Sequence, residues 1–448
     1  MNRFVYNVGI YLLSPLLLSW MGWRARRVGG DWGVMSGPRF GRYDAASKLN
    51  KPVGVHAVSL GEVRAAQPFI EALLAQGDQV LLTHMTVTGR AEGARMFSQA
   101  IQDGRLQQAW LPYDFPGSVC RFLTHYQPCV GVLIEREVWP NIIARARQMR
   151  IPLLLASARF SDNALRQTLR LGSVMRQAYQ SLQVVYAQTL QDAQRLEQAG
   201  VVGVRVSGNF KFDVSLPKEH IERGRAFAQA LSRKMITIAS TREGEDELFI
   251  EAIQKQITRA QSQGVSLEER VLFCLIPRHP QRFDDVARKL ENAGVSYMRR
   301  SDFVQTGETG AVNARIITQG RQLILLGDSL GEMPRYYAAS HVAIVAGSFL
   351  PFGGQNLIEA CATGVPVLVG PYTENFNQAV FDAIQEGAAL RVPNAEAAIQ
   401  QALSLLDEPL RLARMAQAGT QWVSKHTGAV ARVLTGLNEL KALGEKLS

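Results

Sequence analysis

Short apolar runs alternate with helical stretches along almost the whole chain, and this alternation limits the fold more than any other feature. Continuous apolar strands that alternate with helices predict parallel sheets covered on both faces. We therefore expect an α/β protein with two doubly wound sheets. The runs of the first half are 53–58, 80–85, 109–114, 130–135, 151–157, 184–188 and 204–209, and those of the second half are 235–240, 271–277, 322–328, 342–348 and 365–371.

The length and the spacing of the runs divide the chain into domains. At 448 residues it is too long for a single ordinary core. A polar stretch at 209–220 separates the two series of runs and predicts a hinge. We expect Rossmann-like domains at 24–210 and 211–425, followed by a C-terminal helix over 426–448 that could pack back across the hinge. Ligands of such sheets bind beyond the carboxyl ends of the strands.

The N-terminus resembles a membrane anchor. Residues 4–23 carry no charge over 20 positions, about the length that a helix needs to cross a bilayer. Two tryptophans stand at the end of this stretch and three arginines follow it, a pattern that predicts an anchor at 1–23 with its C-terminal side in the cytoplasm. Pro15 and Asn7 leave an interfacial helix open, and a signal peptide or a buried core helix are further alternatives. The flanking residues are Trp20, Trp23, Arg24, Arg26 and Arg27.

The charge of the chain is concentrated in its first half. Residues 1–210 hold 23 Lys and Arg against 13 Asp and Glu, which accounts for the whole net charge of +10. Such a field favours an acidic partner, and the apolar N-terminus favours anionic lipids over nucleic acid.

The four cysteines lack paired spacing, which is typical of a reducing compartment. The seven histidines are scattered and no D-x-D occurs, so local spacing predicts no metal site.

Several strand-to-helix turns of the second half combine glycine with polar residues. Helix N-termini attract phosphate, and glycine lets the backbone approach a ligand, so these turns predict nucleotide binding. Glu359 lies three residues after Asn356, and we expect both on one helix face, where the carboxylate could hold ribose hydroxyls. Simple helix capping is the alternative. The candidates are Ser240, Thr241, Arg278, His279, Gly331, Glu332, Met333, Gly353, Gly354, Gln355, Asn356 and Glu359.

In the first half, acids and a few bases stand where strands end. Glu62 lies in "HAVSLGEV", directly after the first strand, where it could cap the next helix or act as a general base. Arginines beyond the fifth run suggest an anionic acceptor, although some have the spacing of a solvated helix face. The further candidates in this domain are Ser59, Arg90, Glu135, Glu137, Asn141 and Arg159.

Together these features describe a metal-independent glycosyltransferase of the B type. The motifs "HAVSLGEV", "TVTGR", "EREVWPN", "GNFKFD", "PRHPQRF", "GDSLGEM" and "GSFLPFGGQNLIEACATGVPVLVGPYTENF" resemble, in order and over nearly the whole chain, the 3-deoxy-D-manno-octulosonic acid (Kdo) transferases of Gram-negative bacteria. The resemblance implies transfer of Kdo from CMP-Kdo to lipid IVA at the cytoplasmic face of the inner membrane, with inversion and without a cofactor.

The resemblance also assigns roles to residues. Glu62 matches the catalytic glutamate of the family, and Glu137 is expected to orient the acceptor or Arg90 in the catalytic centre. Ser59, Glu135, Asn141 and Arg159 are expected at the acceptor, and the polar turns of the second domain at the donor.

Three positions depart from the pattern of the family, and other functions compete. Gln355, Arg136 and Arg242 stand where the family usually has His, Thr and often His. Gln355 can donate a hydrogen bond but cannot carry charge. The alternatives are a related transferase that uses a UDP-sugar, a nicotinamide-dependent oxidoreductase and a non-enzymatic membrane adaptor. The sequence contains no G-x-G-x-x-G after a first strand, which counts against the oxidoreductase.

Overall fold

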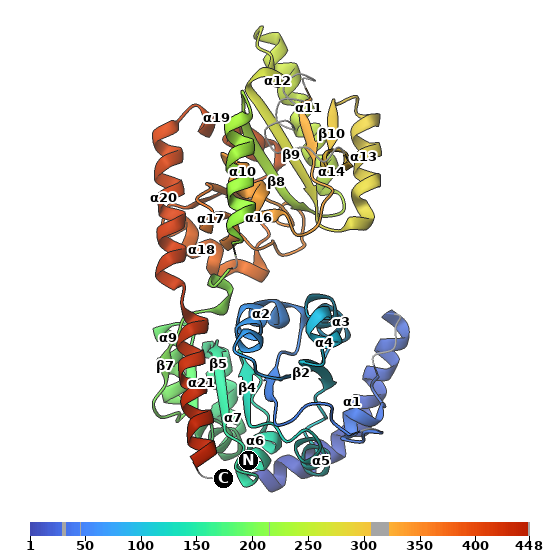
Figure 1. Ribbon diagram of the computed structural model, residues 1–448, viewed down its shortest axis with the longest axis vertical. Coiled ribbons are helices and arrows are strands. Elements are labelled where there is room, and N and C mark those ends of the chain that lie inside the picture. The colour runs from blue at the N-terminus through green and yellow to red at the C-terminus, as the bar shows by residue number, and fades with distance from the viewer. Residues whose placement is uncertain (29–32, 45, 215, 306–321, 447–448) are drawn as a thin grey trace. The chain divides into compact units, whose positions relative to one another are not determined.

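The computed structural model describes residues 1–28, 33–44, 46–214, 216–305 and 322–446. The chain forms two compact units (Figure 1). Unit 1 comprises Met1–Asp213 and His426–Ser448, and unit 2 comprises Val214–Lys425. Both units are parallel α/β sheets with helices, so the predicted fold class is confirmed.

The described residues of unit 1 form a seven-stranded parallel sheet with the order β3-β2-β1-β4-β5-β6-β7. Val53 pairs with Val80 on one side and with Val130 on the other, which places β1 between β2 and β4. The strands are β1 (Val53–His56), β2 (Val80–His84), β3 (Leu106–Trp110), β4 (Val130–Ile134), β5 (Leu153–Ala158), β6 (Val184–Ala187) and β7 (Arg205–Val206).

Helices cover both faces of this sheet. On one face, Phe69 and Leu73 of α2 pack with Val433 and Leu437 of α21, so the last helix completes the core of unit 1. The other face carries the apolar sides of α5, α6, α8 and α9. The helices are α1 (Arg3–Val28), α2 (Leu60–Ala75), α3 (Val87–Met96), α4 (Ser98–Gln102), α5 (Pro116–Tyr126), α6 (Pro140–Gln148), α7 (Asp162–Leu171), α8 (Ser173–Gln180), α9 (Leu190–Gln198) and α21 (Ala429–Lys446), with 3-10 turns η1 (Gly37–Phe40) and η2 (Phe210–Phe212).

The described part of unit 2 repeats this architecture with the order β10-β11-β9-β8-β12-β13-β14. Its strands are β8 (Lys234–Thr241), β9 (Val271–Pro277), β10 (Tyr297–Arg299), β11 (Ile324–Leu326), β12 (Val342–Val345), β13 (Val367–Val369) and β14 (Ala389–Arg391). Its helices are α10 (Lys218–Ala230), α11 (Glu245–Ser262), α12 (Leu267–Arg270), α13 (Phe283–Asn292), α14 (Arg300–Gln305), α16 (Met333–Ala339), α17 (Ile358–Ala362), α18 (Asn377–Gln385), α19 (Ala395–Leu406) and α20 (Pro409–His426), with η3 (Pro280–Arg282) and η4 (Glu374–Phe376).

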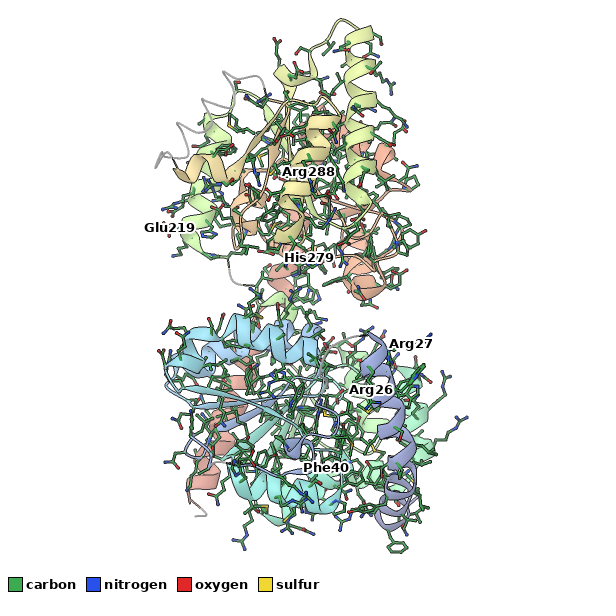
Figure 2. All side chains as sticks on the ribbon, turned by 90° about the vertical axis from the view of Figure 1, so that its right-hand side faces the viewer. Arg26, Arg27, Phe40, Glu219, His279 and Arg288 are labelled. Carbon is green, nitrogen blue, oxygen red and sulfur yellow. The ribbon has the colours of Figure 1, made fainter. Side chains whose placement is uncertain are left out.

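The N-terminal helix α1 is apolar and exposed, yet it is tied to unit 1. Among the described residues it is the one helix long and apolar enough to cross a membrane, and its apolar window is not buried. Tyr6 donates a hydrogen bond of 2.9 Å to Asp114, and Asn141 donates one of 2.7 Å to Asn7. Tyr11 stacks on Phe115 with 5.0 Å between ring centroids. Figure 2 shows Arg26 and Arg27 at the other end of this helix.

Candidate active site

The order of strands in unit 1 reverses between β1 and β4, the place where open α/β sheets bind ligands. Glu62 follows β1, and Glu135 and Glu137 follow β4. Arg90 lies in α3, after the neighbouring strand β2, and Arg159 follows β5. The sheet therefore brings most of the residues predicted in the first half to one edge. Three carboxyl groups stand at its centre.

Glu62 caps the helix that it begins. Its Oε2 accepts hydrogen bonds from the backbone N–H groups of Val58 (2.5 Å) and Ser59 (3.2 Å), and its own N–H donates to Ser59 Oγ at 3.4 Å. This reciprocal arrangement is a capping box. In the part of the chain that the structure describes, no hydrogen bond reaches Oε1 of Glu62. One oxygen holds the helix and the other is available to a substrate.

The surroundings of Glu62 suit a general base. Burial, together with the charges of Glu137 and Glu135, raises the pKa of this carboxyl to about 7, against the opposing effect of the two backbone N–H groups. A base works best when its pKa lies near the working pH, because it is then both ionised and able to take a proton. Helix capping and catalysis are therefore compatible in this side chain.

Glu137 is held from two sides. Trp139 Nε1 donates a hydrogen bond of 3.1 Å to its Oε2, and His56 Nε2 lies 4.0 Å from the same oxygen. His56 is buried, its Nδ1 is 2.9 Å from Thr83 Oγ1, and burial lowers the pKa of the imidazole to about 3. A neutral His56 offers Glu137 no positive charge. Burial raises the pKa of Glu137, against the hydrogen bond from Trp139 and the charge of Arg136.

The backbone is strained beside these acids. Glu135 has a φ of +59° and Ser157 one of +50°, a region that side chains other than glycine rarely adopt. Lys211 Nζ lies 3.6 Å from Glu135 Oε1. Arg136 stands between the two acids in the sequence, but the described residues show no ion pair from it. These positive φ values lie at the carboxyl ends of β4 and β5, beside the acids.

Arg90 belongs to a separate group around Trp110. Its guanidinium lies 4.9 Å from the centre of the Trp110 ring, and that of Arg39 lies 4.0 Å from it. Arg39 is buried and donates to the carbonyl of Met85 at 2.8 Å. Burial lowers the pKa of both guanidinium groups. Over the described ranges no ion pair joins Arg90 to Glu137, so the geometry does not support orientation of Arg90 by that acid.

The remaining candidates of unit 1 have different surroundings. Ser59 is the cap of α2, with its hydroxyl oxygen turned to the N–H of Glu62. Asn141 is buried, and its amide group donates to Asn7 and to the carbonyl of Asp114, at 2.6 Å for the latter. Contact of its amide nitrogen with an acceptor would require these bonds to break. Arg159, the residue that follows β5, is exposed.

In unit 2, the predicted donor residues also gather at the carboxyl edge of the sheet. They end β8 or follow β9, β11 and β12, and the strand order reverses between β8 and β12. Ser240 has a φ of +63° at the end of β8. Thr241 is buried and donates a hydrogen bond of 2.5 Å to Asp246, and the backbone N–H of Arg278 donates to the carbonyl of Thr241 at 2.9 Å.

A buried carboxylate that the sequence analysis did not identify joins two of these loops. Glu245 Oε2 accepts from the backbone N–H groups of Arg242 (2.8 Å) and Gly347 (2.7 Å), and Oε1 accepts from that of Phe349 (2.9 Å). Asp246, also buried, forms an ion pair with Arg282. The acids at the start of α11 in "REGED" could have suggested this role. Glu245 fixes the loops after β8 and β12 to each other.

Glu332 is the centre of a network after β11. It accepts hydrogen bonds from Ser329 (2.6 Å), Arg300 (2.9 Å) and Arg335 (3.0 Å). Burial alone would raise the pKa of Glu332, but these donors and the two positive charges hold it below its usual value. Gly331 has a φ of +78° before it, and Met333 begins α16. Glu332 is therefore ionised and fixed, and it positions this loop.

The glycine-rich loop after β12 differs from the expectation. Helix α17 begins only at Ile358, so Asn356 precedes it. The Oδ1 of Asn356 accepts a hydrogen bond of 3.0 Å from the backbone N–H of Ile358. The prediction that Asn356 and Glu359 share a helix face is therefore wrong. Gly353 and Gly354 have φ values of +84° and +81°, as the close turns of this loop require.

Two side chains complete the surroundings of this loop. The side chain of Gln355 lies directly over Gly347, so little space remains there for a larger residue. Burial raises the pKa of Glu359 to about 7, and the charge of Arg278 opposes this rise. His279 precedes η3 at the end of β9. The described residues contain no group of three His, Cys, Asp or Glu side chains that could hold a metal ion.

Comparison with known proteins identifies the family. The family model described as 3-deoxy-D-manno-octulosonic-acid transferase (kdotransferase) matches residues 36–214. The 3-deoxy-D-manno-octulosonic acid transferase of Bordetella pertussis is 52% identical over 442 residues, which cover 98% of this chain and 99% of the relative. The chain belongs to the Kdo transferase family. The resemblance predicted from the motifs is thereby confirmed, and the protein is a glycosyltransferase.

More distant comparisons agree with this family and with the fold. The Kdo transferase of Haemophilus influenzae is 28% identical over 441 residues, covering 97% of each chain. A crystal structure of a glycosyltransferase from Rickettsia africae covers 88% of this chain and 99% of its own at a TM-score of 0.50. With 14% sequence identity, that structure is evidence for the fold alone.

Proposed function

We propose that the protein transfers Kdo from CMP-Kdo to lipid IVA, a step in the synthesis of the lipopolysaccharide inner core, and that Glu62 is the general base. Membership of the Kdo transferase family carries the choice of sugar. The choice of base rests on one observation: Oε1 of Glu62 has no hydrogen-bond partner among the described residues, in a carboxyl group whose pKa is about 7.

The chemistry follows from what a sugar hydroxyl needs. As the acceptor oxygen forms its bond to the anomeric carbon of Kdo, its proton passes to Oε1 of Glu62. The bond between that carbon and the phosphate oxygen breaks, and its electron pair leaves with CMP. Direct displacement inverts the anomeric centre. Glu137, fixed by Trp139, is the second acid and raises the basicity of Glu62 through its charge.

The departing CMP needs its charge stabilised rather than a strong acid. Backbone N–H groups of the loops after β8 and β12 and the side chains of Arg278 and His279 are assigned this task, without a metal or cofactor. Because α16 has seven residues and α17 five, oriented loop N–H groups and basic side chains matter more here than helix dipoles. Glu359 is assigned to the ribose.

Helix α1 supports association with a membrane. Large apolar side chains such as Phe4 (76% exposed), Leu12 (72%) and Leu16 (71%) face away from unit 1. Because Tyr6 and Asn7 are bonded to unit 1, we place α1 at the interface of the anionic inner membrane, with both units on the cytoplasmic side. This placement gives unit 1 access to an acceptor embedded in the leaflet, and nucleic acid has no part in it.

The decisive experiment combines detergent-solubilised protein, freshly made CMP-Kdo and lipid IVA, with and without chelator, and identifies the products by mass spectrometry. Glu62→Gln is the informative variant because glutamine can still cap α2 but cannot accept a proton. Glu71→Gln, an exposed change on the same helix, is the matched control. We expect chelator-resistant transfer by the wild type and by the control.

In Glu62→Gln we expect transfer to fall by at least about 100-fold, the usual contribution of a general base, with CMP binding retained. Full activity of this variant would return Glu62 to helix capping alone and would move the role of base to Glu137. Wild-type protein that binds UDP in preference to CMP would indicate a UDP-sugar donor instead.

A further inference from the structure

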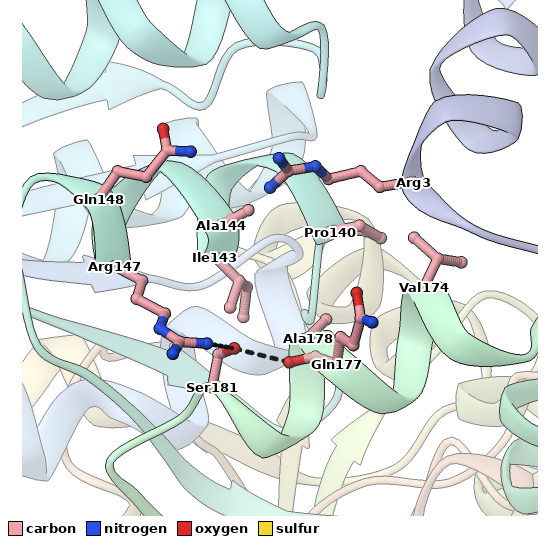
Figure 3. A pocket seen from close by; sticks show the side chains of 10 residues that line it. All are labelled: Arg3, Pro140, Ile143, Ala144, Arg147, Gln148, Val174, Gln177, Ala178 and Ser181. Carbon is pink, nitrogen blue, oxygen red and sulfur yellow. Dashed lines mark hydrogen bonds between the residues drawn. The ribbon is translucent and has the colours of Figure 1, made fainter.

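A cavity of about 360 Å³ lies on unit 1 between α6, α8 and the start of α1 (Figure 3). Its volume lies within the range of small-molecule sites. Ile143 and Ala144 of α6 and Val174 and Ala178 of α8 form apolar walls. Arg3 of α1 reaches over its mouth, as Figure 3 shows. The cavity is outside the catalytic edge of the sheet described above.

A second cavity, of about 190 Å³, adjoins the first. The two share Arg3, Ala144 and Gln148 in their linings, so they form one continuous depression. Asn7, on α1, and Arg145 line the second cavity. The depression is therefore built partly from the helix that carries the exposed apolar side chains.

Three arginines line this depression, and the lining of neither cavity contains an acid. Arg147 donates to Ser181 Oγ at 3.5 Å, and Arg145 donates to Gln148 Oε1 at 3.0 Å and to Cys120 Sγ at 2.8 Å. The Nε of Arg145 is buried without a partner. Throughout the described ranges no carboxylate pairs with any of the three. Such a cluster of cations has spare donors for an anion.

We infer that this depression binds the phosphate headgroup of an anionic membrane lipid, such as a phosphatidylglycerol. Arg3 and Arg147 contact the phosphodiester at the mouth, and Arg145 lies deeper. The acyl chains leave past α1, where the exposed apolar side chains of Phe4 and Val8, four residues apart, share one face of the helix. The inference rests on the membrane association of α1 proposed above. To the general attraction between basic residues and an anionic membrane, it adds a defined binding site for one lipid.

The test measures binding to vesicles of phosphatidylcholine with and without phosphatidylglycerol by co-sedimentation. The full chain carries either Arg3→Gln with Arg147→Gln, or Ala144→Trp, which places a bulky ring in the lining that the two cavities share without changing charge. Lys48→Gln with Arg105→Gln removes two exposed cations of unit 1 outside the depression and is the matched control. Binding is measured at low salt and at about 0.5 M salt, where the Debye length is about 4 Å and diffuse attraction is screened.

We expect the wild type and the control to keep a preference for phosphatidylglycerol at high salt, and both depression variants to lose it by about tenfold. Equal losses in the control, or a preference that vanishes at high salt in the wild type, would overturn the inference. So would tight binding of soluble glycerol phosphate, which would assign the site to a free phosphate ester. A raised KM for lipid IVA with unchanged vesicle binding would assign it to the acceptor.

Kdo transfer in detergent micelles separates the two proposals. Transfer without any preference for phosphatidylglycerol would leave the proposed function standing and remove the lipid site. A preference without transfer would do the reverse. Thermal melting of each variant shows whether it folds, and Ala144→Trp tests the cavity even if the arginine variants prove unstable.

Discussion

The hydroxyl of Tyr6 donates a hydrogen bond of 2.9 Å to the carboxylate of Asp114, 108 positions further along the chain. The same carboxylate accepts the backbone N–H groups of Asn141 and Ile142 at 3.0 Å each, at the start of α6. One buried acid therefore fixes both α6 and the membrane helix. The rotation of α1 about its own axis is set by this contact, which turns its apolar side outward.

Replacing Tyr6 with phenylalanine should loosen α1 without unfolding unit 1. The loss of a hydrogen bond to a charged group predicts destabilisation of the docked helix by about 1.5–3 kcal/mol. Hydrogen exchange of the first turns of α1 should accelerate by roughly 10- to 100-fold. Tyr11→Phe, which keeps the stacking on Phe115, is the control and should change little. Unchanged exchange in Tyr6→Phe would show that apolar contacts alone hold the helix.

The rate of transfer should depend on pH through Glu62. With its pKa raised to about 7, kcat/KM should fall as pH drops below 7, because the protonated base cannot accept the proton of the hydroxyl. Glu137→Gln removes a charge that raises this pKa, so the midpoint should move to lower pH, by up to about one unit, while burial keeps it above 4.5.

Comparison of the two neighbouring acids sharpens this prediction. Glu135→Gln should shift the midpoint less than Glu137→Gln, because Glu135 contributes less to the pKa of Glu62. Full pH–rate profiles of the three proteins are the measurement. An identical midpoint in the wild type and both variants would show that the loss of activity at low pH reports the titration of another group.

Loss of the Glu245 carboxylate should disrupt the donor loops of unit 2. In Glu245→Ala, the N–H groups of Arg242, Gly347 and Phe349 lose their acceptor in the interior. Unsatisfied buried groups cost about 1–3 kcal/mol each, so we expect a loss of at least about 3 kcal/mol in the free energy of unfolding, and weaker CMP binding. Denaturant unfolding and calorimetry measure these, with the exposed Glu251→Ala as control. Normal CMP affinity would separate Glu245 from the donor site.

Neutralising the basic flank of α1 should weaken membrane binding in a salt-dependent way. Arg24, Arg26 and Arg27 are exposed, and the guanidinium groups of Arg24 and Arg27 lie over the rings of Trp20 and Trp23. At about 1 kcal/mol per arginine near an anionic surface, the triple glutamine variant should bind anionic vesicles roughly 100-fold less tightly at low salt. The difference should shrink as salt rises. Salt-independent retention would show that the apolar side chains suffice.

Strands buried on both faces could be predicted from the sequence, and the two edge strands of the unit 2 sheet could not. The run 271–277 coincides with β9, because a buried strand of a parallel sheet is apolar throughout. The three-residue strands β10 and β14 were not predicted. Both lie at the edges of the unit 2 sheet, where polar residues are tolerated and little apolar pattern remains. The run 109–114 was placed late, since β3 begins at Leu106 and ends at Trp110.

For the site, the sequence identified which residues reach the sheet edge but not their surroundings. Glu62 could be located from its strand-turn-helix pattern. Its raised pKa comes first from burial and then from the charges of Glu137 and Glu135, which lie more than 70 positions away and meet it only through the pairing of β1 with β4. The contacts of Asn141 with α1 span 134 positions and have no local signal. Contacts between residues so far apart in the sequence can be identified only once the fold is known.

The position of α21 has a consequence for synthesis on the ribosome. Val433 and Leu437 fill the core of unit 1 beside α2, yet they are translated after all of unit 2. At 5–20 residues per second, roughly 20–80 s pass between the emergence of α1 and that of the helix that completes its unit. The apolar N-terminus is thus exposed to a nascent-chain targeting factor, or to the bilayer itself, while unit 1 is still unfinished. Delivery to the membrane can therefore precede folding.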